Sequence, residues 1–317
     1  MRDGDVDPLE QGRERPAGPR FPFWIRAAFG LIVLGGVAYA VFDAGRDVDG
    51  IPWPGPALVV LSVALLLAML AAGARAWDVL MRGHAHGRDL LRAFALAQVS
   101  KYVPGGVAQV LGQAGHSRQA GASTSAVVTG MTAQALVGVL APGLTSVVVL
   151  MAVDDEPSAG ARVLLGVACT LGTVLLLSPR FLTAVVRSRM VARLPGVRHL
   201  EIPAGDVLLR AYAWGLVALL CLGLAFAALL LPSVDSGRDV VLVTLSYAVA
   251  FLVGFLVIPV PAGLGVREGA LVALVTPVVD AQSALATAVL LRVLQLGVDV
   301  VVASGILVRG ARRPRSS

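Results

Sequence analysis

The most unusual charged residue of this chain is Lys101, which lies inside an apolar region. It is the only lysine of the chain, and it belongs to residues 100–106, which read SKYVPGG. A second interruption of apolar sequence, residues 258–269 (IPVPAGLGVREG), carries Arg267 and Glu268 about half a chain length later. A charge at the centre of a bilayer costs at least about 2.5–3.5 kcal/mol on insertion scales, so each such group is expected to have a partner or a function.

Both interruptions could bind an anion. Pro104 and Pro261 lack an N–H donor, and each allows a new helix to begin just after it. The amides at such a helix N-terminus carry partial positive charge and suit a phosphate, and Lys101 and Arg267 would add full charges. Paired broken segments in two halves of a chain are typical of a transporter's central site. The alternatives are that Lys101 snorkels to the membrane interface and that Arg267 and Glu268 form a structural ion pair.

Further polar groups follow a helical spacing in neighbouring apolar segments. Arg292, Gln295 and Asp299 are three and four residues apart, which places them on one helical face that must point away from lipid. Arg292 either pairs with Asp299 or joins the cationic site. Gln109 and Gln113 are four residues apart after the first interruption, and either line a cavity or form interhelical hydrogen bonds.

The composition is that of a polytopic membrane protein. Hydrophobic residues make up 57%, charged residues 15%, and mean hydropathy is +0.81, against roughly 45–50% and about 25% in soluble domains. The net charge of +6 comes from arginines in short loops, which indicate topology rather than nucleic-acid binding. His84 and His86 have no acidic or cysteine companion at ligand spacing, and Cys169 and Cys221 fall within apolar spans. We therefore expect no metal, no cofactor, no nucleic-acid partner and no enzymatic activity.

Hydropathy predicts an all-α integral membrane bundle. Six full spans are expected over residues 24–42, 57–75, 123–153, 163–177, 207–231 and 284–308. Arginine-rich loops follow the second and fourth spans, and arginines also follow the last span, so these segments and both termini are expected to be cytoplasmic. The predicted domains are a disordered tail over 1–22, one transmembrane domain over 23–310 and a basic tail over 311–317.

Two re-entrant hairpins are expected between these spans, giving eight apolar segments. The arms at 90–103 and 107–114 are each too short to cross, so they are predicted to meet at a tip formed by residues 104–106. In the second half, residues 240–258 are long enough to span alone, whereas 269–279 are not. They form either a hairpin entering from the outer face or a complete span followed by a broken one. We favour the hairpin, which makes the two halves an inverted repeat.

The two motifs together resemble a known family. They read Lys101-Tyr102-x-Pro104-Gly105 and Pro259-x-Pro261-x-Gly263-x-Gly265-x-Arg267-Glu268-Gly269, a pattern similar to that of the flippase-like family, also called the lysylphosphatidylglycerol synthase transmembrane region. The resemblance implies lipid movement between leaflets. Where this family often has an arginine, this chain has Gln113, for which Arg118 is a candidate substitute, and Ala262 replaces a common glycine. The predicted substrate-binding residues are Lys101, Tyr102, Pro104, Gly105, Gln109, Gln113, Arg118, Pro261, Gly263, Gly265, Arg267, Glu268 and Arg292.

The function predicted from these features is lipid translocation in a bacterial plasma membrane. The expected ligand is an anionic phospholipid or a polyprenyl-phosphate-linked glycolipid. One alternative is a non-transporting subunit that anchors or regulates a separately encoded glycosyltransferase or lipid synthase. Another is an ion-coupled transporter of small solutes that uses Asp299 or Glu268 as a proton site. Because the sequence ends at Ser317, we expect no aminoacyl-transferase domain to accompany the membrane region.

Overall fold

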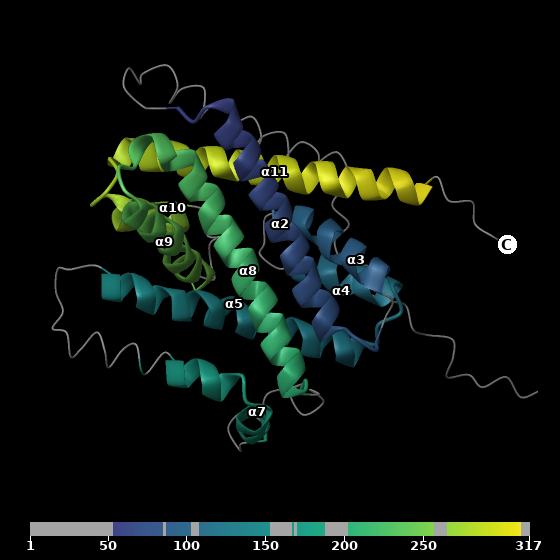
Figure 1. Cartoon of the computed structure of the whole chain (residues 1–317). Helices are drawn as coiled ribbons and strands as arrows, with labels where there is room; N and C mark the ends of the chain where they lie inside the picture. The colour runs from purple at the N-terminus through teal and green to yellow at the C-terminus, as the bar shows by residue number, and fades with distance from the viewer. Residues whose placement is uncertain are drawn as a thin grey trace, which may run out of the picture.

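The computed structural model describes residues 53–84, 87–102, 108–152, 167, 170–187, 202–256 and 265–311 (Figure 1). Regular structure within these ranges is helical, and they contain no strand, which confirms the predicted all-α class. The predicted N-terminal tail and first span lie outside the described residues. So does the predicted C-terminal tail, apart from Ala311, the last residue of the final helix.

Five helices of the described residues are long and apolar enough to cross a membrane. These segments are Pro56–Leu80, Thr124–Ser146, Gly205–Ser233, Gly237–Phe255 and Ala281–Val308. Four of them coincide with predicted spans. The predicted span over 163–177 is helical at residues 170–176, and most of its remainder is not described. The span count of the whole chain and the inverted repeat stay predictions.

The most extensive contact between described helices is that of α2 (Pro56–Leu80) with α8 (Gly205–Leu230), which run side by side in front of α5 (Thr124–Ala152). Leu66 and Trp77 of α2 and Phe226 of α8 are completely buried in the main core. Small residues allow the close packing that membrane helices use. Gly223 of α8 lies so close to α9 (Gly237–Leu256) that an added Cβ would collide with the carbonyl oxygen of Thr244.

The first interruption lies between two short helices that pack against each other, α3 (Gly87–Ser100) and α4 (Ala108–Gln119). They have 14 and 12 residues, whereas a span needs about 20. The prediction of two arms too short to cross is confirmed. Their connection, residues 103–107, is outside the described part of the chain, and the placement of the pair within a bilayer stays a prediction.

The second interruption lies between helices of unequal length. The first, α9, has 20 residues and is itself a candidate span, whereas α10 (Val266–Val275) has only 10. This agrees with the lengths predicted for residues 240–258 and 269–279. The two helices pack against each other, as α3 and α4 do, and the choice between a hairpin and a full span stays a prediction.

The last helix, α11 (Ala281–Ala311), contacts both broken regions. In Figure 1 it extends along one side of the molecule, from the α9 and α10 region to beyond α3. It packs against α10, α3, α8 and α2. The described part also contains α7 (Pro179–Val186), a short 3-10 helix, η3 (Leu231–Ser233), and the helical residues 170–176. Because α11 touches both regions, its side chains can connect the two motifs.

Candidate functional site

A polar face on α11 is buried against the two broken regions. Asp299 is completely buried, and Gln295 is nearly so. Arg292 lies two turns before Asp299 on the same face, as the spacing predicted. The three side chains are therefore available to neighbouring helices rather than to lipid.

Asp299 is the partner of the first motif. Its Oδ2 lies 2.7 Å from Lys101 Nζ and accepts a hydrogen bond of 2.9 Å from the Tyr102 hydroxyl. Lys101 also donates to Gln98 Oε1 at 3.4 Å, and its ammonium lies 5.1 Å from the centre of the Tyr102 ring. Lys101 and Tyr102 directly follow α3, so the end of this helix positions both groups against α11.

Glu268 is the centre of the second motif. Its Oε1 accepts a hydrogen bond of 2.7 Å from Arg292 Nε, and its Oε2 accepts one of 2.7 Å from the Gly265 amide. Gly265 has φ of +81°, a conformation that suits glycine, and precedes the first residue of α10. The helix N-terminus expected after Pro261 thus begins at Val266. The Gly265 amide, just before this N-terminus, already donates its hydrogen bond to the carboxylate of Glu268.

Arg267 is buried between α10 and α9. Its guanidinium lies 5.1 Å from the centre of the buried Tyr247 ring, a cation–π contact, and its Nε is 4.0 Å from Glu268 Oε1. Gly254 of α9 allows this approach, since an added Cβ would come within 3.0 Å of Arg267 Cβ. Glu268 Oε1 lies within 4.0 Å of both Arg267 and Arg292, and Arg292 shares α11 with Asp299, the partner of Lys101, so both motifs contribute to one cluster.

We call these five ionisable groups the charged cluster. It consists of Lys101, Arg267, Glu268, Arg292 and Asp299. Each exposed fraction is small: side-chain values are 15% for Lys101, 9% for Arg267 and 14% for Arg292. Buried charges are tolerated only when each has a close opposite charge and further hydrogen bonds. The cluster meets the first part of this condition, because each of its charges has an opposite charge within 4.0 Å, contributed by three helical elements.

The other predicted site residues take no part in the contacts described above, or they or their side chains are outside the described part. Gln113 donates a hydrogen bond of 2.7 Å to Gln134 on α5, so it joins two helices. Arg118 is exposed in the last turn of α4. Gln109 belongs to α4. Pro104, Gly105, Pro261 and Gly263 are not among the described residues.

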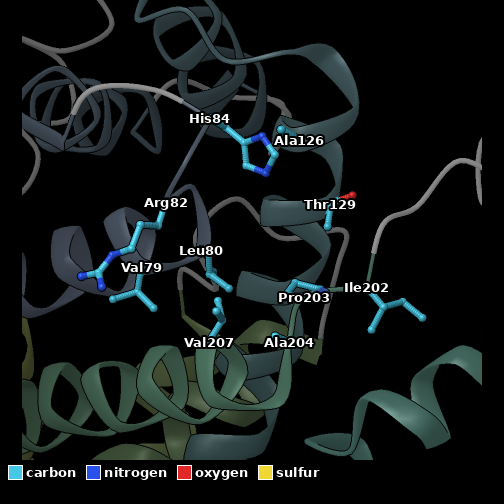
Figure 2. Close-up of a pocket in the computed structure, with 10 residues that line it drawn as sticks. All are labelled: Val79, Leu80, Arg82, His84, Ala126, Thr129, Ile202, Pro203, Ala204 and Val207. Atoms are coloured by element: carbon cyan, nitrogen blue, oxygen red, sulfur yellow. The ribbon is translucent and has the colours of Figure 1, made fainter.

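A separate cavity of about 190 Å³ lies where the C-terminal end of α2 meets the start of α8 (Figure 2). Most of its lining residues are apolar, including Leu80, Pro203 and Val207, and its polar lining residues are Arg82, His84 and Thr129. None of the five cluster residues lines it. The cavity is therefore distinct from the site that the two motifs form.

The family comparison agrees with the resemblance carried by the motifs. The model of the lysylphosphatidylglycerol synthase TM region matches residues 23–303. The chain belongs to this family. A search of curated proteins finds no match. As a lysylphosphatidylglycerol synthase TM region, the chain is a membrane protein of a family involved in lipid handling.

Sequence reasoning found four of the five charged groups as site residues and left the partners open. For Lys101 it considered an anionic ligand or snorkelling to the membrane interface, whereas in the structure Lys101 pairs with Asp299. For Arg292 it left open a pair with Asp299, whereas in the structure Arg292 pairs with Glu268. The sequence signal that could have identified the partner of Lys101 was Asp299, an acidic residue in the middle of the last predicted span. The contribution of Tyr247 was missed because an apolar strip surrounds it in the sequence.

Proposed function

We propose that this membrane protein is a lipid translocase of a bacterial plasma membrane, with both termini in the cytoplasm. Its cargo would be an anionic phospholipid or a polyprenyl-phosphate-linked glycolipid. The observation that supports this most strongly is the burial of Lys101, Arg267 and Arg292, from three elements, in one cluster. The family match supports lipid as the ligand class.

A lipid phosphate is the chemical group that such a cluster suits. Transfer of an isolated ionised group into a medium of low dielectric costs tens of kcal/mol by a Born estimate. Arg267 and Arg292 each offer a planar fork of donors that matches phosphate oxygens, and Lys101 adds a compact charge. Cations held in place by helices reduce the cost of passing the headgroup while its tails stay in lipid.

The internal carboxylates explain how the cluster is stable without a phosphate. Asp299 neutralises Lys101, and Glu268 neutralises Arg292. A phosphate that enters would compete with these carboxylates for the same cations. If phosphate replaces a carboxylate as the partner of a cation, that cation stays close to an anion throughout. Movement of either motif away from α11 therefore costs less free energy when lipid is bound.

The test is lipid transfer in proteoliposomes that contain this protein alone. Fluorescent phosphatidylglycerol and a polyprenyl-phosphate hexose are placed in one leaflet, and their accessibility to a quencher is followed. We expect wild type to move one of them. Lys101→Gln and Arg267→Gln should slow transfer at least about tenfold, the effect of losing one hydrogen bond to a charged group.

Matched controls remove arginines that lie on the surface. Arg92→Gln on α3 and Arg210→Gln on α8 break exposed ion pairs and should leave transfer unchanged. Thermal unfolding in detergent establishes that each variant is folded. The proposal is refuted if folded wild-type protein moves neither lipid, or if both cluster variants transfer lipid as fast as wild type does.

A further inference from the structure

The two partners that the structure gives Asp299 are neighbours in the chain. Lys101 Nζ lies 2.7 Å from Asp299 Oδ2, and the Tyr102 hydroxyl donates to the same oxygen at 2.9 Å. Both residues directly follow Ser100, the last residue of α3. A movement of this end of α3 away from α11 therefore takes both partners from Asp299 in one event.

Asp299 is poorly placed to stay ionised after such a movement. Its side chain is completely buried, and it lies within the candidate span Ala281–Val308. Its second oxygen, Oδ1, accepts no hydrogen bond from the described residues. An ionised group that is isolated in a medium of low dielectric becomes neutral rather than remaining charged. Acidic residues inside membrane spans commonly carry protons for this reason.

Glu268, the other carboxylate of the cluster, keeps partners within its own motif. When Arg292 moves away with α11, Glu268 Oε2 still accepts from the Gly265 amide at 2.7 Å. Arg267 Nε also remains 4.0 Å from Glu268 Oε1. These partners are within three residues of Glu268 in the chain, so they move with it. Separation of α11 from the motifs therefore destabilises the ionised form of Asp299 more than that of Glu268.

Lys101 is the cation that the structure places on Asp299. On the helices packed against α11, the other cluster members pair with each other, Arg267 and Glu268 on α10 with Arg292 on α11 itself. Ion pairs within α2, α3 and α8 each include an exposed side chain: Arg75 with Asp78, Arg92 with Asp89, and Arg210 with Asp206. Tyr212 and Cys221 on α8 are uncharged near pH 7.

We propose that Asp299 is a proton-binding site, filled when Lys101 leaves it for the phosphate of the cargo. This inference rests on the proposed function for the cargo and adds the proton as a coupled second substrate. One proton passes from water to an Asp299 oxygen as the ammonium leaves, and it returns to water when Lys101 pairs with the carboxylate again. Cargo and proton are bound in the same state, so they cross together, and a pH gradient drives the lipid toward the alkaline side.

The first experiment needs no lipid. Lys101→Met removes the cation and leaves Asp299 in place, so Asp299 should be protonated near pH 7 in the folded variant. Infrared spectroscopy of the full chain detects the C=O stretch of a protonated carboxyl, which should appear in Lys101→Met and be absent from Lys101→Met/Asp299→Asn. The matched control is Arg210→Gln, which removes the cation from the exposed Asp206 and should show no such band. A folded Lys101→Met protein without the band overturns the inference.

The second experiment uses wild-type protein, so it decides the question even if Lys101→Met does not fold. Binding of a short-chain phosphatidylglycerol and of a polyprenyl-phosphate hexose is measured by calorimetry near pH 7, in two buffers with different enthalpies of ionisation. For the lipid that binds, we expect uptake of about one proton per lipid by wild type and close to none by Asp299→Asn. Binding to wild type without proton uptake overturns the inference.

Transfer in proteoliposomes separates this inference from the translocase proposal. Coupling of one proton to one lipid predicts that a gradient of one pH unit shifts the equilibrium distribution of the lipid about tenfold toward the alkaline side. Asp299→Asn should remove this dependence. Transfer by wild type that ignores the gradient contradicts only the inference made here. A protonated Asp299 in Lys101→Met, with no binding or transfer of either lipid by wild type, contradicts the translocase proposal alone.

Discussion

The buried pair of Lys101 and Asp299 predicts strong coupling between two substitutions. Lys101→Met removes the ammonium and keeps most of the apolar stem. Asp299→Asn removes the negative charge and keeps an oxygen that can accept from the Tyr102 hydroxyl. The double variant is neutral and retains that hydrogen bond, so it isolates the charge pair as far as this structure permits.

The structure determines the expected magnitudes. Breaking a buried pair by removing one partner costs about 3–5 kcal/mol because an uncompensated charge remains. Asp299 is completely buried, so Lys101→Met should lie near the upper end of this range. Lys101 is 15% exposed and keeps its contact with Gln98, so Asp299→Asn should cost less. In the double variant we expect a loss of about 1–3 kcal/mol, well below the sum of the single losses.

The measurement is the free energy of unfolding in mixed micelles, from titration with a denaturing detergent. The matched control is the exposed pair of Arg210 and Asp206 on α8, whose charged atoms are 3.5 Å apart. Its coupling should be below about 1 kcal/mol, as for surface pairs. If the effects of Lys101→Met and Asp299→Asn simply add to within about 0.5 kcal/mol, the pair does not exist in the protein and the reasoning fails.

Three further predictions concern stability at single positions. Asp280→Ala should cost about 1 kcal/mol, because Asp280 Oδ1 accepts from the Ser283 amide at the start of α11. Hydrogen bonds at Ser283 lower the pKa of the Asp280 carboxyl. Asp280→Ala should therefore lower the free energy of unfolding fully at pH values above the unfolded-state pKa of Asp280. The difference from wild type should shrink as pH falls through the lower folded-state pKa, which unfolding measurements at several pH values would show. Gly223→Ala should destabilise the protein by more than about 1 kcal/mol in the same detergent titration, because its Cβ collides with the backbone of Thr244. Gly297 is a helical glycine with no heavy atom near an added Cβ, so Gly297→Ala should be neutral or stabilising by up to about 1 kcal/mol. An equal loss of stability at Gly223 and Gly297 would contradict the close approach of α8 to α9 at Gly223.

The helices were predictable because hydropathy and length decide where a segment can cross a membrane. The helices α2, α5, α8 and α11 follow the predicted spans, and the arms of the first broken region appear as α3 and α4. The two motifs were equally visible, since a charge beside Pro and Gly in apolar sequence stands out. These features depend on local sequence alone.

The pairing inside the site could not be predicted in the same way. Arg292 and Asp299 lie seven residues apart, a rise of about 10.5 Å along a helix, which is more than the three- or four-residue spacing of neighbouring side chains. They therefore bind different motifs. Which motif each one meets depends on the rotation of α11 and its position along α3 and α10, and hydropathy does not determine either quantity.

The position of Arg292 and Asp299 on one late helix also has a consequence for synthesis in the cell. The chain is made from its N-terminus, so Lys101 and Glu268 enter the membrane before the residues that neutralise them. Until α11 is inserted, the first motif lacks Asp299 and the second lacks Arg292. Nascent chains that end before α11 should therefore be substrates for quality-control proteases, and assembly of both broken regions is completed in one late step.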